Sequence, residues 1–106
     1  MQNDEINAVW DKRNEFNTVE TLVTIKDAPN ITWDGGPCRP YAIRFLHTRF
    51  NGGPWQSVVT IYAMRPNAVI GSWFRPDEVY MPPQWLTDLI RQGGPDAEMS
   101  VTDRPS

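Results

Sequence analysis

The chain has 106 residues, of which 40% are hydrophobic and 22% are charged, and its formal net charge is −3. This length suits one domain with a single core. No apolar run approaches the ~20 residues that span a bilayer, and the acidic start "MQNDEINAVW" lacks a secretory signal pattern. Cys38 is the only cysteine, which excludes an internal disulfide. We therefore expect a cytoplasmic protein without membrane contact, too acidic to be a non-specific DNA coat.

Charge is distributed unevenly along the chain. Residues 1–37 hold three cations and seven carboxylates, residues 38–76 hold five arginines and no carboxylate, and residues 77–106 hold two arginines and six carboxylates. Two interpretations fit this pattern. The acidic ends could fold against the basic middle, or the middle could form a cationic surface for an anionic partner.

The first predicted element is a helix over residues 3–14. Asn3 can cap it, and Asp4 and Glu5 suit the positive end of its dipole. Ile6, Val9 and Trp10 recur at helical spacing, so they form a narrow apolar stripe.

The next segment, residues 18–26 ("TVETLVTIK"), is rich in β-branched residues and predicts a strand. Alternation places one set of side chains on a buried face: Val19, Thr21, Val23 and Ile25. Residues 27–40 contain three prolines and two glycines, which predicts a long loop, and such loops tend to be functional or mobile.

A hairpin is predicted from residues 41–50 and 55–65, closed by the turn sequence Asn51–Pro54. A four-residue loop would place Phe50 opposite Trp55 and fix the register from there. One face of the hairpin would then carry Leu46, Val59 and Ile61, and the other would carry Ile43, Phe45 and Val58. Neither face would be polar, so both would need a cover.

After a turn at residues 65–67, a third strand is predicted over residues 68–74, with Gly71 at a bulge or close approach, and a helix over residues 83–92. The expected fold is α+β, with a small, mainly antiparallel sheet of three to four strands and a helix at each end. Residues 1–92 would form this single domain, and residues 93–106 a mobile acidic tail.

No catalytic motif is recognisable. Cys38 and His47 could pair as nucleophile and base, but no family signature surrounds them. Asp34, Asp77 and Glu78 lie in predicted loops without a defined separation. The glycine pairs lack the Lys-Ser/Thr of a phosphate loop. We therefore expect no enzymatic activity, no metal and no cofactor.

The remaining signal is the alternation of arginines with aromatic residues, which is typical of protein-binding hot spots. The residues expected to contact a protein partner, or a second copy of the chain in a homo-oligomer, are Arg49, Phe50, Trp55, Trp33 and Arg39. The alternative is a surface that binds nucleic acid or an anionic nucleotide-like ligand through stacking and guanidinium contacts. Its candidate residues are Arg44, Arg49, Arg65, Tyr62 and Trp73.

The small size, the excess of eight arginines over two lysines, and the richness in Trp and Pro resemble small orphan proteins of actinobacterial phages. The resemblance is one of composition and carries no motif. It implies a phage accessory or host-modulating factor.

Overall fold

The structure, a computed structural model, describes residues 6–93. Its elements, in chain order, are β1 (Asn7–Glu15), β2 (Thr18–Lys26), β3 (Ile31–Trp33), β4 (Gly36–Thr48), β5 (Gln56–Met64), β6 (Ser72–Phe74), the 3₁₀ turn η1 (Pro76–Glu78), β7 (Val79–Tyr80) and α1 (Gln84–Gly93). Within residues 6–93, α1 is too short to cross a membrane, and no other helix could do so.

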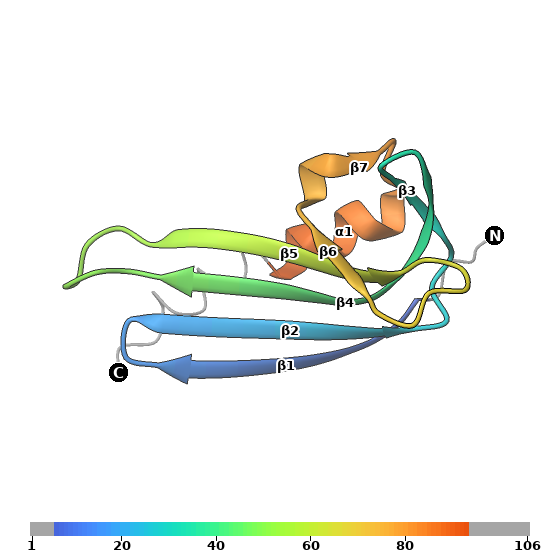
Figure 1. The fold of residues 1–106 in the computed structure, drawn as a ribbon. Helices are drawn as coiled ribbons and strands as arrows, with labels where there is room; N and C mark the ends of the chain where they lie inside the picture. The colour runs from blue at the N-terminus through green and yellow to red at the C-terminus, as the bar shows by residue number, and fades with distance from the viewer. Residues whose placement is uncertain (1–5, 94–106) are drawn as a thin grey trace.

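All strand pairs are antiparallel. Five strands lie side by side in the order β1, β2, β4, β5, β6 (Figure 1). The first residues of β4 pair with β3, which in turn pairs with β7. The β1–β2 and β4–β5 turns both lie at one end of the molecule, and β3 and β7 lie at the other (Figure 1).

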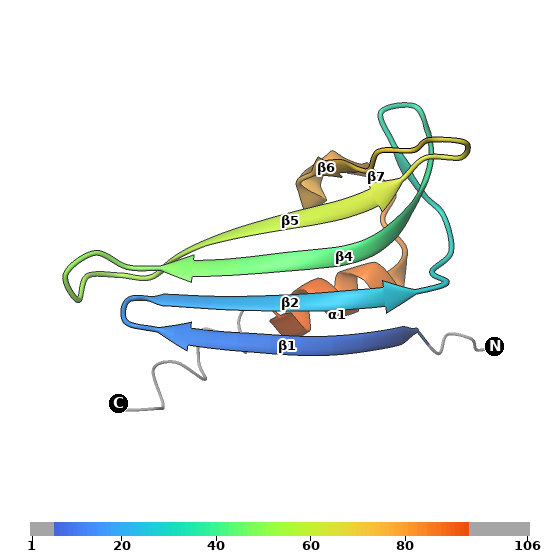
Figure 2. The same ribbon diagram turned by 60° about the horizontal axis from the view of Figure 1, so that its bottom comes forward.

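One face of the sheet packs against α1 and forms the core (Figure 2). The buried residues of β2 are Val19, Thr21, Val23 and Ile25, which confirms the predicted strand and its buried face. From the neighbouring strands come Ile43, Phe45, Ile61 and Phe74, and from the helix Leu86 and Leu89.

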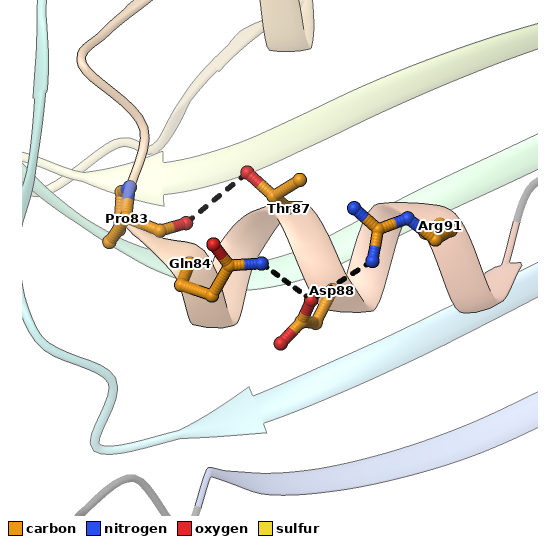
Figure 3. Close-up of polar contacts among 5 residues, drawn as sticks. All are labelled: Pro83, Gln84, Thr87, Asp88 and Arg91. Atoms are coloured by element: carbon orange, nitrogen blue, oxygen red, sulfur yellow. Dashed lines mark hydrogen bonds and ion pairs between the residues drawn. The ribbon is translucent and has the colours of Figure 1, made fainter.

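The helix near the C-terminus is confirmed, shifted by one residue from the predicted range. The carbonyl of Pro83 accepts hydrogen bonds from the backbone N–H of Leu86 and Thr87, each at 3.1 Å, and from the Thr87 hydroxyl at 3.4 Å. Further along the helix, Asp88 accepts from Gln84 Nε2 at 2.8 Å and from Arg91 Nη1 at 3.2 Å (Figure 3). These local contacts stabilise α1 and hold its polar side chains away from the core.

The opposite face, which we call the open face, has no described element over it (Figure 2). It mixes apolar and polar groups because alternate residues of each strand point there. Arg44 and Glu20 form an ion pair at 2.6 Å in its centre, and Leu46 and Val58 lie opposite each other in the register. A mixed face of this kind can stay in contact with water.

The predicted α+β fold with an N-terminal helix is wrong. Residues 7–15 form strand β1, which pairs with β2 over its whole length. The spacing of Ile6, Val9 and Trp10 fits a helical stripe, but Ala8 and Trp10 also alternate as a strand requires. Pairing with β2 decides between the two, because tertiary contacts override weak local preference. The residues before Ile6 lie outside the described range.

The prediction of three to four strands is also wrong, because residues 6–93 form a sheet of seven strands. The segment 27–40, expected to be a loop, contains β3 and the start of β4. The predicted third strand, residues 68–74, is shorter in the structure and forms only β6. The turn predicted before it is confirmed, because the Ala68 N–H donates to the Arg65 carbonyl at 3.1 Å. Gly71 makes the close approach expected there, since an added Cβ would overlap the Tyr41 ring.

The predicted hairpin register is off by one residue. Phe45 lies opposite Val59 and Thr48 opposite Gln56, so the connecting loop runs from residue 49 to 55 and is longer than predicted. A slip of one residue exchanges the faces of one strand relative to the other. In the observed register one face is the apolar core and the other is mixed, so the expectation of two apolar faces is wrong.

Within the predicted tail 93–106, Gly93 is the last residue of α1. The rest of that segment lies outside the described residues.

Candidate hairpin-end surface

The two long hairpins end side by side (Figure 1). The first ends in the two-residue turn Phe16–Asn17, and the second in the loop 49–55. We call these residues together the hairpin end. Asn17 has φ 66°, a left-handed conformation that asparagine adopts more readily than most residues, so it allows the tight turn between β1 and β2.

Arg49 connects the two turns through hydrogen bonds. Its backbone N–H donates to the Asn17 carbonyl at 3.1 Å, and its side-chain Nε donates to Asn17 Oδ1 at 3.1 Å. The guanidinium carbon also lies 4.6 Å from the centre of the Trp55 ring, in a cation–π contact. One side chain therefore links the β1–β2 turn to both ends of the β4–β5 loop.

The phenylalanines at this end point into solvent. Phe16 is 88% exposed and Phe50 is 82% exposed. Phe50 begins a tight turn in which the Gly53 N–H donates to the Phe50 carbonyl at 2.9 Å, with Asn51 and Gly52 at positive φ. The predicted pairing of Phe50 with Trp55 is absent, because Trp55 packs on Arg49. The turn geometry holds Phe50 outward.

Of the five predicted contact residues, three meet at the hairpin end and two do not. Trp33 lies in β3 at the opposite end of the molecule (Figure 1). Its ring stacks on Phe74 at 4.5 Å, and Arg65 covers its other side at 4.8 Å. Arg39 lies in β4 opposite Met64, also far from the hairpin end. Trp33 therefore supports the fold at the far end.

The alternative anion-binding set is spread over three regions. Arg44, Tyr62 and Trp73 lie on the open face, where the hydrogen bond to Glu20 raises the pKa of Arg44 against the opposing effect of burial. Arg49 lies at the hairpin end. Arg65 donates to the carbonyls of Trp33 at 2.7 Å and Pro37 at 3.3 Å. Each of these arginines already has a partner within the chain.

The candidate catalytic groups do not assemble. Cys38 is fully buried in the core, and burial raises the pKa of its thiol, only partly opposed by the charge of Arg65. His47 is buried farther along the same strand, with Nδ1 at 2.6 Å from Ser57 Oγ. Strand geometry keeps Cys38 and His47 far apart. Asp34 lies in the β3–β4 turn, and the carboxylates of Asp77 and Glu78 belong to η1.

Within residues 6–93, no three His, Cys, Asp or Glu side chains gather in a way that could hold a metal ion.

Sequence reasoning missed Phe16 and Asn17 as parts of the surface. The residue that could have revealed this turn is Asn17, because an asparagine directly before a β-branched strand often marks a hairpin turn. It was hidden by the expectation of a helix in residues 3–14, which would have placed Phe16 in a linker.

Comparison of the chain with protein-family models, with curated proteins and with solved structures finds no match. What the hairpin end does must therefore be argued from its geometry.

Proposed function

We propose that the protein is a non-enzymatic protein-binding module that contacts its partner through the hairpin end. The observation that carries this proposal is the pair of exposed phenylalanines, Phe16 and Phe50, on two turns that Arg49 ties together. Two large apolar rings held in water have no role in the core of this chain. Exposed at a projecting end of the molecule, they suit insertion into an apolar pocket of another protein.

The surrounding groups favour such a contact. Trp55 and Arg49 lie next to the phenylalanines, and aromatic residues and arginine are the types that contribute most to protein interfaces. The turns are held by backbone and side-chain hydrogen bonds, so little conformational entropy is lost when a partner binds. The pocket on the partner should be lined by aliphatic or aromatic side chains.

The alternative, a nucleic-acid or nucleotide surface, has less support. Such surfaces combine a continuous cationic track with stacking aromatics. In this chain Arg44, Arg49 and Arg65 lie in separate regions, and each already binds groups of the chain itself. Protein recognition is therefore the function we propose.

The biological setting that we propose follows the composition of the chain. A phage accessory or host-modulating factor acting in the cytoplasm would find its partner among host or phage proteins. The buried, unpaired Cys38 suits a reducing compartment.

The test uses a photo-cross-linking amino acid at position 50 and, as a control, at position 69. Val69 is 91% exposed but lies in the β5–β6 connection, outside the hairpin end. In a lysate of the source cells, position 50 should cross-link to a defined protein and position 69 should not. That protein is then purified and its affinity is measured.

The double variant Phe16→Ser and Phe50→Ser should weaken the purified complex by at least about 30-fold, since a single hot-spot residue already contributes about 2 kcal/mol or more. Val69→Ser should leave the affinity unchanged. Both proteins should stay folded, because the replaced side chains are exposed. Equal affinity of the wild type and the double variant, or cross-linking only from position 69, would contradict the proposal.

A further inference from the structure

The outer edge of β1 has no strand partner among the described residues. β1 spans Asn7–Glu15 and pairs with β2 on one side only. In an antiparallel ladder, the N–H and C=O groups of alternate residues point outward from such an edge. An unpaired edge of this length is a template for another strand.

A groove runs beside this edge, between β1 and α1. Its volume is about 360 Å³, and it is lined by five apolar residues, Ile6, Ala8, Trp10, Trp85 and Leu89, and by the polar side chains of Asp88 and Gln92. Trp10 stacks on Phe45 with ring centres 5.9 Å apart and is still 38% exposed. A strand added to β1 would place alternate side chains against this groove, which is how strand addition gains specificity.

The charges of β1 indicate which strand fits. Asp11 and Arg13 are two residues apart on the open face, both largely exposed, and their side chains are 3.8 Å apart. An antiparallel second copy of β1, centred on Lys12, would bring Asp11 opposite Arg13 of the other copy, and Arg13 opposite Asp11. Oppositely charged residues at directly paired positions stabilise a ladder, and like charges destabilise it.

The other registers that pair most of β1 lack this match. Centring on Asp11 would place two aspartates opposite each other, and centring on Trp10 would place Asp11 opposite Val9. Centring on Lys12 leaves one like-charged pair, Lys12 with its copy, against two oppositely charged pairs.

We propose that two copies of the chain associate through their β1 edges, in antiparallel register about Lys12, into one continuous sheet. In this register the core-facing residues of both β1 strands point to the same side of the joined sheet. Both α1 helices therefore lie on that side, and the two grooves meet across the new pairing. Trp10 and Trp85 of each copy then become covered. The hairpin ends point in opposite directions and stay free, so this inference does not depend on the proposed function.

The experiment measures the mass of the full-length chain by sedimentation velocity over a range of concentrations, for the wild type and for charge variants of β1. The wild type should show a reversible dimer. Asp11→Arg alone and Arg13→Asp alone should each weaken the dimer about tenfold, because two attractive pairs become repulsive. The double variant D11R and R13D should restore the dimer, because the directly paired positions of the two copies again carry opposite charges.

Two controls separate this interface from other surfaces. Val58→Lys places a charge on the open face and should leave the dimer intact, as should the double serine variant of Phe16 and Phe50. Urea unfolding of each variant checks that it is folded. A monomer at all concentrations, a dimer that either control disrupts while D11R does not, or no recovery in the double charge variant would overturn the inference.

Discussion

Gly93 brings the end of helix α1 into close contact with the sheet. An added Cβ at this position would overlap the aromatic ring of Phe45 in β4. Gly93 is buried although it is the last residue of α1. A glycine lets the backbone of the helix end lie directly on an aromatic ring, so this residue sets the distance between the two layers.

We predict that Gly93→Ala destabilises the protein. Intrinsic helix propensity alone would favour alanine by as much as ~1 kcal/mol. Overlap with a packed ring typically costs 1–3 kcal/mol, and we expect a net loss of roughly 1 kcal/mol or more. The urea midpoint of unfolding measures this loss of stability, and Gln92→Ala, at an exposed position of the same helix, serves as the control. The loss should shrink when Phe45 is also replaced by leucine, and a stabilised Gly93→Ala variant would contradict the packing argument.

Arg65 shows how a residue predicted for binding can have a structural role. Its guanidinium contacts the Trp33 ring and donates to the backbone carbonyls of Trp33 and Pro37. Gly36 leaves room for it, since an added Cβ there would be 2.7 Å from Arg65 Nη1. Arginine next to an aromatic residue is the same pattern in a sequence whether it supports a turn or binds a ligand. Only the fold distinguishes the two.

At the scale of elements, local patterns predicted β2 and α1 because each has one consistent period. The β-branched run of residues 18–26 alternates strictly, and Leu86 and Leu89 repeat at helical spacing. The prediction for β1 was wrong because its few apolar residues fit both the helical period and the alternation of a strand. Its strand conformation comes from pairing with β2, a contact that the segment itself does not encode.

The β4–β5 register depends on loop length, which the turn residues alone did not fix. We predict that Val59→Thr costs about 1 kcal/mol or more and that Val58→Thr changes stability by less than about 0.5 kcal/mol. Val59 packs against the core and would bury an unpaired hydroxyl, whereas Val58 lies 44% exposed on the open face.

The same two valines distinguish the observed register from the predicted one. In the slipped register, Val58 would share the face of Ile43 and Phe45, and its replacement would be the costly one. Urea unfolding of both variants provides the comparison, and Thr keeps strand propensity nearly constant. A larger loss for Val58→Thr would contradict the observed pairing.

For the molecule as a whole, the uneven charge of the sequence is only partly explained by internal pairing. Of the five arginines in residues 38–76, Arg44 pairs with a carboxylate of the acidic first segment, Glu20. Arg49 and Arg65 bind an amide, backbone carbonyls and aromatic rings instead. Both sequence interpretations assumed that charges would meet charges. In the described residues, two of these five arginines, Arg49 and Arg65, connect distant segments through neutral partners.

The candidate surface could be predicted only in part, because some of its residues are close in the sequence and others are brought there by the fold. Arg49, Phe50 and Trp55 are close in the sequence, so the turn that joins them identified them. Phe16 and Asn17 reach the same place only because β2 pairs with β4. Trp33 and Arg39 were included because arginines alternate with aromatic residues in the sequence. They lie at the other end of the sheet, in β3 and near the start of β4 (Figure 1).

The single core predicts how the protein unfolds. Leu86 and Leu89 of α1 belong to the same buried cluster as Val23, Phe45 and Ile61 of the sheet. Helix and sheet should therefore unfold in one cooperative transition, and far-ultraviolet circular dichroism and tryptophan fluorescence should give the same urea midpoint. Because β2 must pair with β4 across a long stretch of chain, refolding should take milliseconds to seconds. Separate midpoints for the two signals would contradict this, since they would mean that α1 leaves the sheet before the strands separate.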